Sequence, residues 1–240
     1  MALFGLFAKK SDADLLKKHA ERATNRRAQA VDRWDGIQAL VRLRSPEAVE
    51  ALLPRFTFYV DPSITDQEEK DAAFEGIVSL GEGAIAPIVT FMRRAESLSW
   101  PLKMLDRLST PATVMQHLTE LLAEMDVEYE RDPQRKIQIL SALEERRDPS
   151  IAGSVVRFLR DANETTRFQA ASALLAQAEA SEHRAALVAC LVAEDSVRVR
   201  NRILEAFASL GWDVGPNADA VRARLPAGYK LDSRGIPHRA

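Results

Sequence analysis

The feature that most constrains this chain is a spacing of apolar side chains behind a cation, which recurs along its length. In "NETTRFQAASALL" (163–175), Arg167 is followed by alanines three and four positions later and by Ala173 and Leu174 at six and seven. Such offsets lie on one face of an α-helix. The stretch "SVRVRNRILEAF" holds apolar side chains at the same offsets from Arg200. Both stretches are therefore predicted to be amphipathic helices of one kind.

This register occurs six times. Offsets are counted from the cation of each copy, which stands at residues 33, 70, 136, 167 and 200. In the third copy Leu98 takes the place of the cation. Residue types that favour a helix N-cap stand four residues before four of these positions. They are Asp66, Asp132, Asn163 and Ser196, while Gln29 and Arg94 occupy this place in the other two copies. Small residues recur at the third and sixth offsets, and they predict that a neighbouring helix approaches closely there.

Each copy is followed by a turn and a second apolar segment. The predicted second helices run over about residues 47–56, 84–94, 112–125, 150–160, 183–193 and 218–225. A helical hairpin of this size cannot bury its apolar faces alone, whereas stacking of successive hairpins buries them in one continuous core. The sequence therefore predicts an all-α solenoid of about six helical hairpins.

With these stretches the chain resembles the HEAT-repeat family. The most similar variety is the short HEAT-like repeat of the phycobilisome-lyase type, whose first helix reads approximately D-x-x-x-V-R-x-x-A-A-x-A-L. "NETTRFQAASAL" and "DSVRVRNRILEAF" carry that pattern, and the resemblance covers about residues 29–225. It implies a concave face lined by the second helices. It also implies that the recurring cation pairs with acidic or amide side chains near the turns, which is a structural role.

The ends of the chain differ from the repeats. Residues 1–28 hold the apolar run "ALFGLF" and then a charged segment, 9–28, predicted to be a capping helix. Residues 226–240 hold proline and glycine without a helical period, and they are predicted to form an extended tail that folds back over the last hairpin. Because no stretch approaches the ~20 apolar residues of a membrane helix, and lysines follow the first apolar run instead of preceding it, we expect a cytoplasmic protein.

Composition narrows the function classes. Aromatic residues make up 6% of the 240 residues, which favours helices over sheets. The net charge of −2 argues against a nucleic-acid or membrane partner, although residues 1–55 hold 11 Lys and Arg against 7 Asp and Glu. The single cysteine, Cys190, excludes an internal disulfide and a multi-cysteine zinc site, and it is predicted to be a buried core residue.

No pattern for catalysis or for a cofactor is found. The four histidines, at 19, 117, 183 and 238, include no i, i+4 pair. Deoxyhypusine hydroxylase, a protein with HEAT-like repeats, resembles a di-iron protein with His-Glu pairs. This chain contains only the reversed pair Glu182–His183. "GEGAIAP" (81–87) lacks the Lys-Ser/Thr of a phosphate loop and follows no strand. We therefore expect no enzyme activity, no cofactor and no metal.

The candidate binding surface is basic. Five arginines stand on the predicted second helices away from the apolar stripe: Arg55, Arg93, Arg94, Arg157 and Arg160. Such a ridge suits an acidic partner segment or phosphates. The competing interpretation is a solvated surface of mixed charge, because Glu50, Glu120 and Glu124 share these faces. The loops 57–66 and 125–132 are the next candidates.

These observations predict a non-enzymatic scaffold or adaptor that binds another protein through the concave groove of the solenoid. One alternative is a nucleic-acid-binding HEAT-like protein related to DNA glycosylases, which the basic groove favours and the net charge opposes. The other is a lyase-like chromophore or modification factor, which rests on the resemblance alone. The sequence leaves the partner and the oligomeric state open.

Overall fold

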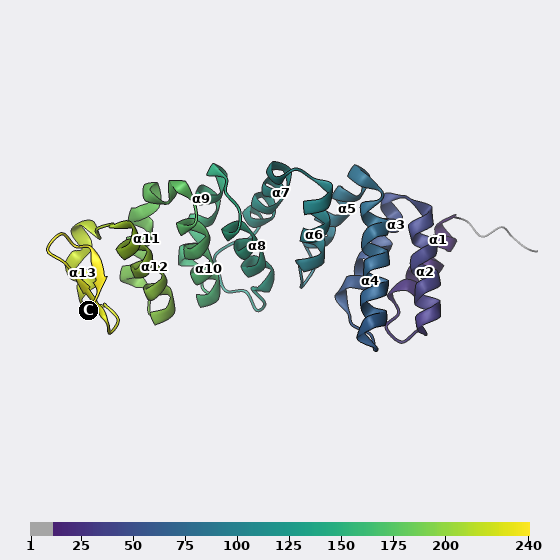
Figure 1. Ribbon diagram of the computed structural model, residues 1–240, viewed down its shortest axis with the longest axis horizontal. Helices are drawn as coiled ribbons and strands as arrows, with labels where there is room; N and C mark the ends of the chain where they lie inside the picture. The colour runs from purple at the N-terminus through teal and green to yellow at the C-terminus, as the bar shows by residue number, and fades with distance from the viewer. Residues whose placement is uncertain (1–11) are drawn as a thin grey trace, which may run out of the picture. The chain divides into compact units, whose positions relative to one another are not determined.

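The computed structural model describes residues 12–240, and helices form most of this part of the chain (Figure 1). The predicted "ALFGLF" segment lies outside the described residues. The described chain divides into two compact units, one ending at Val114 and the other spanning Met115–Ala240. No single helix among the described residues is long and apolar enough to cross a membrane, although the bent pair Ser63–Val78 and Gly81–Met92 passes that test jointly.

Unit 1 is built from helices that pack mainly against their neighbours in sequence. Its elements are α1 (Asp12–Thr24), α2 (Ala30–Leu43), α3 (Pro46–Leu52), η1 (Leu53–Thr57), α4 (Ser63–Val78), η2 (Gly81–Ala84), α5 (Ile85–Met92) and α6 (Ser99–Leu108), with η denoting a 3-10 helix. α7 (Pro111–Ala123) contains the division between the units. The charged segment predicted to cap the chain forms α1.

The helices of unit 1 form two rows. In the first row α2 packs on α4 and α4 on α6. In the second row α1 and α5 both pack on α3. Glycines permit close approaches between α2 and α1 and between α4 and α2. A Cβ at Gly36 would lie 2.7 Å from the backbone nitrogen of Ala23, and a Cβ at Gly76 would overlap the side chain of Val41. Gly36 and Gly76 hold the third and sixth offsets of their copies, so the predicted role of small residues there is confirmed.

Unit 2 repeats this arrangement. Its elements after α7 are α8 (Gln134–Glu144), α9 (Pro149–Val155), η3 (Val156–Arg160), α10 (Glu164–Leu175), η4 (Ala178–His183), α11 (Arg184–Ala193), α12 (Val197–Leu210), η5 (Gly215–Asn217), α13 (Ala218–Arg222), β1 (Tyr229–Leu231) and β2 (Pro237–Arg239). α8, α10 and α12 lie side by side, and α11 packs on both η3 and α13 (Figure 1). The all-α prediction is thereby confirmed.

The predicted N-caps have mixed outcomes. Asn163 and Ser196 cap α10 and α12, accepting hydrogen bonds from the amides of Thr166 and Val199. Asp66 is not a cap, because α4 begins one turn earlier, at Ser63. α8 starts after Pro133, and Asp132 bonds the amide of Gln134 instead of a later one. Leu98, and not Arg94, stands at the N-cap of α6.

The C-terminal segment, predicted to be extended, contains a short antiparallel hairpin. β1 pairs with β2 so that Lys230 lies opposite His238. The turn is stabilised by Asp232, whose carboxylate accepts hydrogen bonds from the amides of Arg234 and Ile236, each at 2.8 Å. β2 packs against α12, so this segment covers the last first-row helix of unit 2.

Candidate binding site

Repeated buried ion pairs underlie the surface of unit 2. Lys136 on α8 donates to Asp161 at the end of η3, at 2.8 Å. Arg167 on α10 donates two hydrogen bonds to Glu194 at the end of α11, at 2.6 and 2.8 Å. Each carboxylate also accepts the backbone amide two residues further on, at 2.8 Å in both cases. The cation of each first helix therefore holds the end of the second helix that follows it.

This geometry confirms the predicted structural role of the recurring cation. The pair is largely shielded from solvent, since 20% of the Arg167 side chain and only 1% of the Glu194 side chain are exposed. In the last hairpin Arg200 donates to the backbone carbonyl of Arg224 at 2.7 Å, where no acidic side chain takes the place of Glu194.

Unit 1 buries a denser cluster of charges, and it overturns one site prediction. Arg55 was expected on the exposed basic face, but its side chain is fully buried. It bonds Glu69 and Asp66, both at 2.8 Å, while Arg33 also bonds Glu69 and Lys70 also bonds Asp66. The reason is the connection over residues 58–62, which leads the chain from η1 back into α4, so that acids on α4 meet Arg55. The predicted loop 57–66 is therefore shorter, because α4 already begins at Ser63. Arg55 is structural.

The ion pairs shift the pKa values of their carboxylates. Burial alone would raise the pKa of Glu194, but hydrogen bonds from Arg167 and from backbone amides outweigh burial and leave that pKa below its ordinary value. The pKa of Asp66 is also lowered, since hydrogen bonds from Lys70 and Arg55 overcome its burial. Both carboxylates are therefore ionised at neutral pH, and neither suits a role as a general acid.

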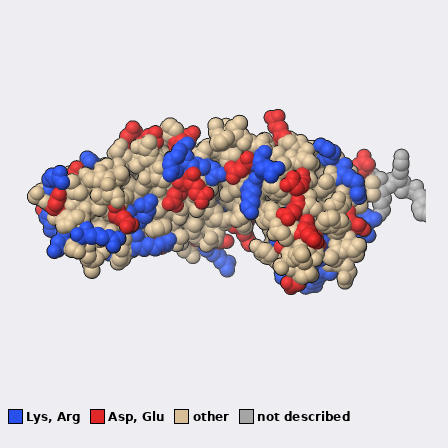
Figure 2. All heavy atoms as spheres, in the orientation of Figure 1, with Lys and Arg blue, Asp and Glu red and all other residues tan. Residues whose placement is uncertain are grey.

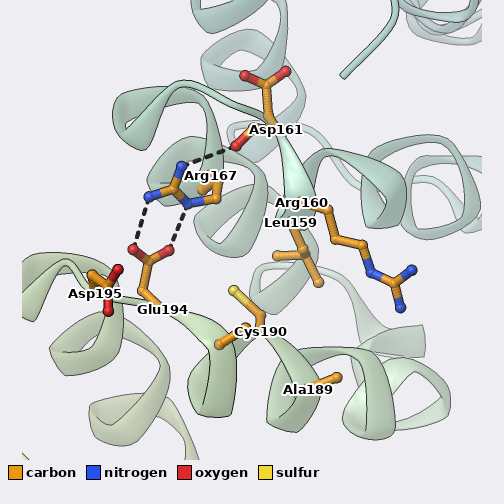
Figure 3. Close-up of a pocket in the computed structure, with 9 residues that line it drawn as sticks. Leu159, Arg160, Asp161, Arg167, Ala189, Cys190, Glu194 and Asp195 are labelled. Atoms are coloured by element: carbon orange, nitrogen blue, oxygen red, sulfur yellow. Dashed lines mark hydrogen bonds and ion pairs between the residues drawn. The ribbon is translucent and has the colours of Figure 1, made fainter. Parts of the chain in front are cut away.

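Two adjoining cavities open beside these pairs in unit 2. One, of about 390 Å³, is lined by the Arg167–Glu194 pair, by Cys190 and by alanines of α11 (Figure 3). The other, of about 440 Å³, lies between residues 126–127, η3 and Ala186. Leu159 and Arg160 line both cavities and form the ridge between them. The second-helix surface of unit 2 is thus hollowed on both sides of one arginine.

The two predicted site arginines of this surface have different surroundings. Arg157 is exposed, and its guanidinium donates to the carbonyls of Leu122 and Met125, at 2.7 and 2.6 Å. Because these carbonyls lie at the C-terminal end of α7, Arg157 caps that helix end. The Arg160 side chain is also exposed, points away from the Arg167–Glu194 pair (Figure 3), and has no ion pair or hydrogen bond within residues 12–240. Of these two arginines, Arg160 is the one whose guanidinium remains available to a ligand.

Unit 1 carries the other two exposed arginines. Arg93 and Arg94 follow α5 and both are exposed. Arg94 lines a cavity of about 600 Å³ whose walls include Phe56, Phe91 and Trp100. The sequence analysis did not predict this cavity, because its walls come from residues far apart in the chain. The signal that could have found it is the aromatic run "FTFY" (56–59), at the start of the predicted loop 57–66.

One cavity of unit 2 is lined by the single cysteine of the chain, Cys190. Burial, the largest influence, raises the pKa of Cys190 to about 12, so its thiol is protonated at neutral pH. Because the thiolate is the reactive form of cysteine, Cys190 is a poor nucleophile. Within residues 12–240 no group of three or more His, Cys, Asp or Glu side chains is arranged to hold a metal ion.

Charge on the surface is mixed. Lys and Arg are interspersed with Asp and Glu on the face shown in Figure 2, over both units. Comparison with known proteins adds no assignment: no family model, no curated protein and no solved structure matches the chain. The fold and the candidate site define an all-α protein of serially packed helices with cavities lined by arginines.

Proposed function

We propose that this protein is a non-enzymatic scaffold, an α-solenoid of HEAT-like hairpins that binds an acidic segment of a partner protein along its second helices. The observation that carries the proposal is the pair of adjoining cavities on the second-helix side of unit 2, divided by Arg160. A partner segment that crosses this ridge places apolar side chains in both cavities and a carboxylate on the arginine.

The solenoid part of the proposal is supported by the regularity of the ion pairs. Lys136 and Arg167 meet acids 25 and 27 residues further along the chain, and Arg200 meets a carbonyl 24 residues further on. A contact that recurs at nearly constant separation is expected of stacked copies of one hairpin. In each unit the helices also pack with neighbours of their own row.

Binding of an acidic segment is supported by the state of Arg160. An exposed guanidinium without a partner presents its donors in the planar geometry that suits a carboxylate. The floor beside it is apolar, formed by Val156, Leu159 and Ala186. Arginines beside apolar pockets are typical of the residues that dominate protein–protein interfaces.

The test compares two charge reversals. Arg160→Glu places a negative charge on the ridge, whereas Arg147→Glu makes the same change at an exposed position just beyond the first-row helix α8. Affinity capture from native lysate with the wild type should yield partners that Arg160→Glu loses and Arg147→Glu keeps, since like charges across an interface are costly. Equal retention by both variants contradicts the proposal.

The same proteins separate the scaffold from nucleic-acid binding. A scaffold should show no salt-dependent affinity for random duplex DNA. If the wild type binds such DNA with an affinity that falls steeply as salt rises, and Arg160→Glu does not, the groove is a nucleic-acid site.

A further inference from the structure

The cavity of about 600 Å³ in unit 1 has walls from three elements of the chain. Phe56 comes from η1, Phe91 from α5 and Trp100 from the first turn of α6, while Tyr59 lies on the loop after η1. This volume lies within the range of small-ligand pockets, about 300–1,000 Å³. Such a concentration of aromatic rings is notable in a chain in which they make up only 6% of residues.

The aromatic walls are fixed by packing. The ring of Trp100 lies 5.1 Å from that of Phe56 and 5.9 Å from that of Phe74, measured between centroids. Phe56 and Phe91 are 8% and 6% exposed, so they form a rigid base. Tyr59 is 75% exposed, and its ring lies 3.7 Å from the ammonium of the buried Lys70. The cavity therefore offers preorganised faces for another ring.

Two cations border the aromatic walls without acidic partners. Arg94 lines the cavity and is exposed, and Lys103 lies with its ammonium 4.8 Å from the Trp100 ring. Neither side chain forms an ion pair within residues 12–240. Glu96 is the one acidic residue of the lining, and it has a contact of its own. The charge at the border is thus complementary to a carboxylate.

We propose that this cavity receives an aromatic side chain of an acidic peptide segment, with the ring against Phe56 and Trp100 and a neighbouring carboxylate on Arg94. The inference rests on the proposed function, since it assigns the chemistry of a partner segment. Aromatic rings pack at centroid distances of about 4.5–7 Å, the spacing already present in the wall. The serine and threonine hydroxyls of the lining, on Thr57, Ser97 and Ser99, can bond the peptide backbone.

The test follows the indole N–H resonance of Trp100 in the ¹⁵N-labelled full chain. This resonance is assigned by Trp100→Phe and independently by elimination, with Trp34→Phe and Trp212→Phe. Acetyl-Asp-Phe-Asp-amide should shift it saturably. Acetyl-Lys-Phe-Lys-amide and acetyl-Asp-Ala-Asp-amide should each bind at least about tenfold more weakly, a difference of about 1.4 kcal/mol.

Arg94→Gln should weaken binding of the acidic peptide about tenfold. The control is Arg107→Gln, which removes an exposed positive charge from the last turn of α6 and should leave binding unchanged. The proposal is overturned if the Asp-Phe-Asp peptide produces no saturable shift, if the lysine peptide binds equally well, or if Arg94→Gln has no effect. Tighter binding of adenosine 5′-monophosphate than of the peptide would also overturn it, in favour of a nucleotide.

Failure here is distinguishable from failure of the scaffold function. If lysate capture is lost in Arg160→Glu but the peptide never binds, the scaffold stands and this cavity is not its anchor. If peptide binding depends on Arg94 but lysate capture does not depend on Arg160, the cavity of unit 1 binds the peptide and the cavities beside Arg160 are not the partner-binding surface.

Discussion

Glu194 shows at the scale of one residue how this chain accommodates buried charge. Its side chain is 1% exposed, and it accepts two hydrogen bonds from Arg167 and one from the amide of Ser196. A buried pair of this kind adds little net stability compared with apolar residues, yet loss of one partner leaves an uncompensated charge. The residue therefore fixes how the hairpin ends more than it strengthens the core.

Arg167→Ala should lower the free energy of unfolding by about 3 kcal/mol, because it strands the Glu194 carboxylate. This is comparable with Leu174→Ala, which removes a fully buried side chain of α10 and should cost about 2–5 kcal/mol. Urea melts measure both. The double variant Arg167→Met/Glu194→Gln, which removes both charges, should be more stable than Arg167→Ala. If Arg167→Ala lowers the free energy of unfolding by less than about 0.5 kcal/mol, the pair is solvated and the account is contradicted.

The lowered pKa of Glu194 predicts the direction of a pH dependence. A carboxylate whose pKa is lower in the folded than in the unfolded state stabilises the fold above the unfolded pKa, and this stability is lost as pH falls through the folded pKa. Because the ordinary value is 4.5, the free energy of unfolding should decline below about pH 4.5. Glu194→Gln should show a shallower decline over that range in urea melts, and an unchanged slope would contradict the assignment.

At the scale of elements, the sequence predicted the helices and their alternation because the apolar offsets are strong local signals. The predicted second helices at 150–160 and 183–193 correspond to α9 with η3 and to α11. Loops were harder. The burial of Arg55 depends on where the connection over residues 58–62 returns the chain, which no local pattern encodes. The aromatic cavity was missed for the same reason, since its walls come from separate elements.

Glycines test which helix surfaces are in contact. Gly76→Ala places a methyl group against Val41 between α4 and α2, and should destabilise by about 1–3 kcal/mol. Gly153→Ala is the matched control in α9, where nothing lies within 4 Å of the new Cβ. It should stabilise by about 0.5–1 kcal/mol through helix propensity. Thermal or urea unfolding of both variants measures this, and equal effects would mean that the two first-row helices are not in close contact.

At the scale of the whole molecule, the two units share one construction. Each has a row of first helices, a row of second helices and cavities where second helices end. Four of the five arginines predicted as site residues are exposed, and three of those line cavities. Periodicity alone could place them on second helices or directly after them. Periodicity could not show that Arg157 bonds carbonyls at the end of α7 while Arg160 has no such partner, because these bonds depend on how the chain turns between α7 and α8.

Site-specific photocrosslinking tests the central claim, that the second-helix surface binds a partner protein, most directly. Benzoylphenylalanine in place of Ala186 stands in the cavity beside Arg160, and the same residue in place of Ser209 stands on an exposed position of the first-row helix α12. After irradiation in native lysate, the protein substituted at Ala186 should form a discrete crosslinked product that mass spectrometry assigns to another protein, and the protein substituted at Ser209 should not. Crosslinking from Ser209 alone, or equally from both positions, would contradict the account.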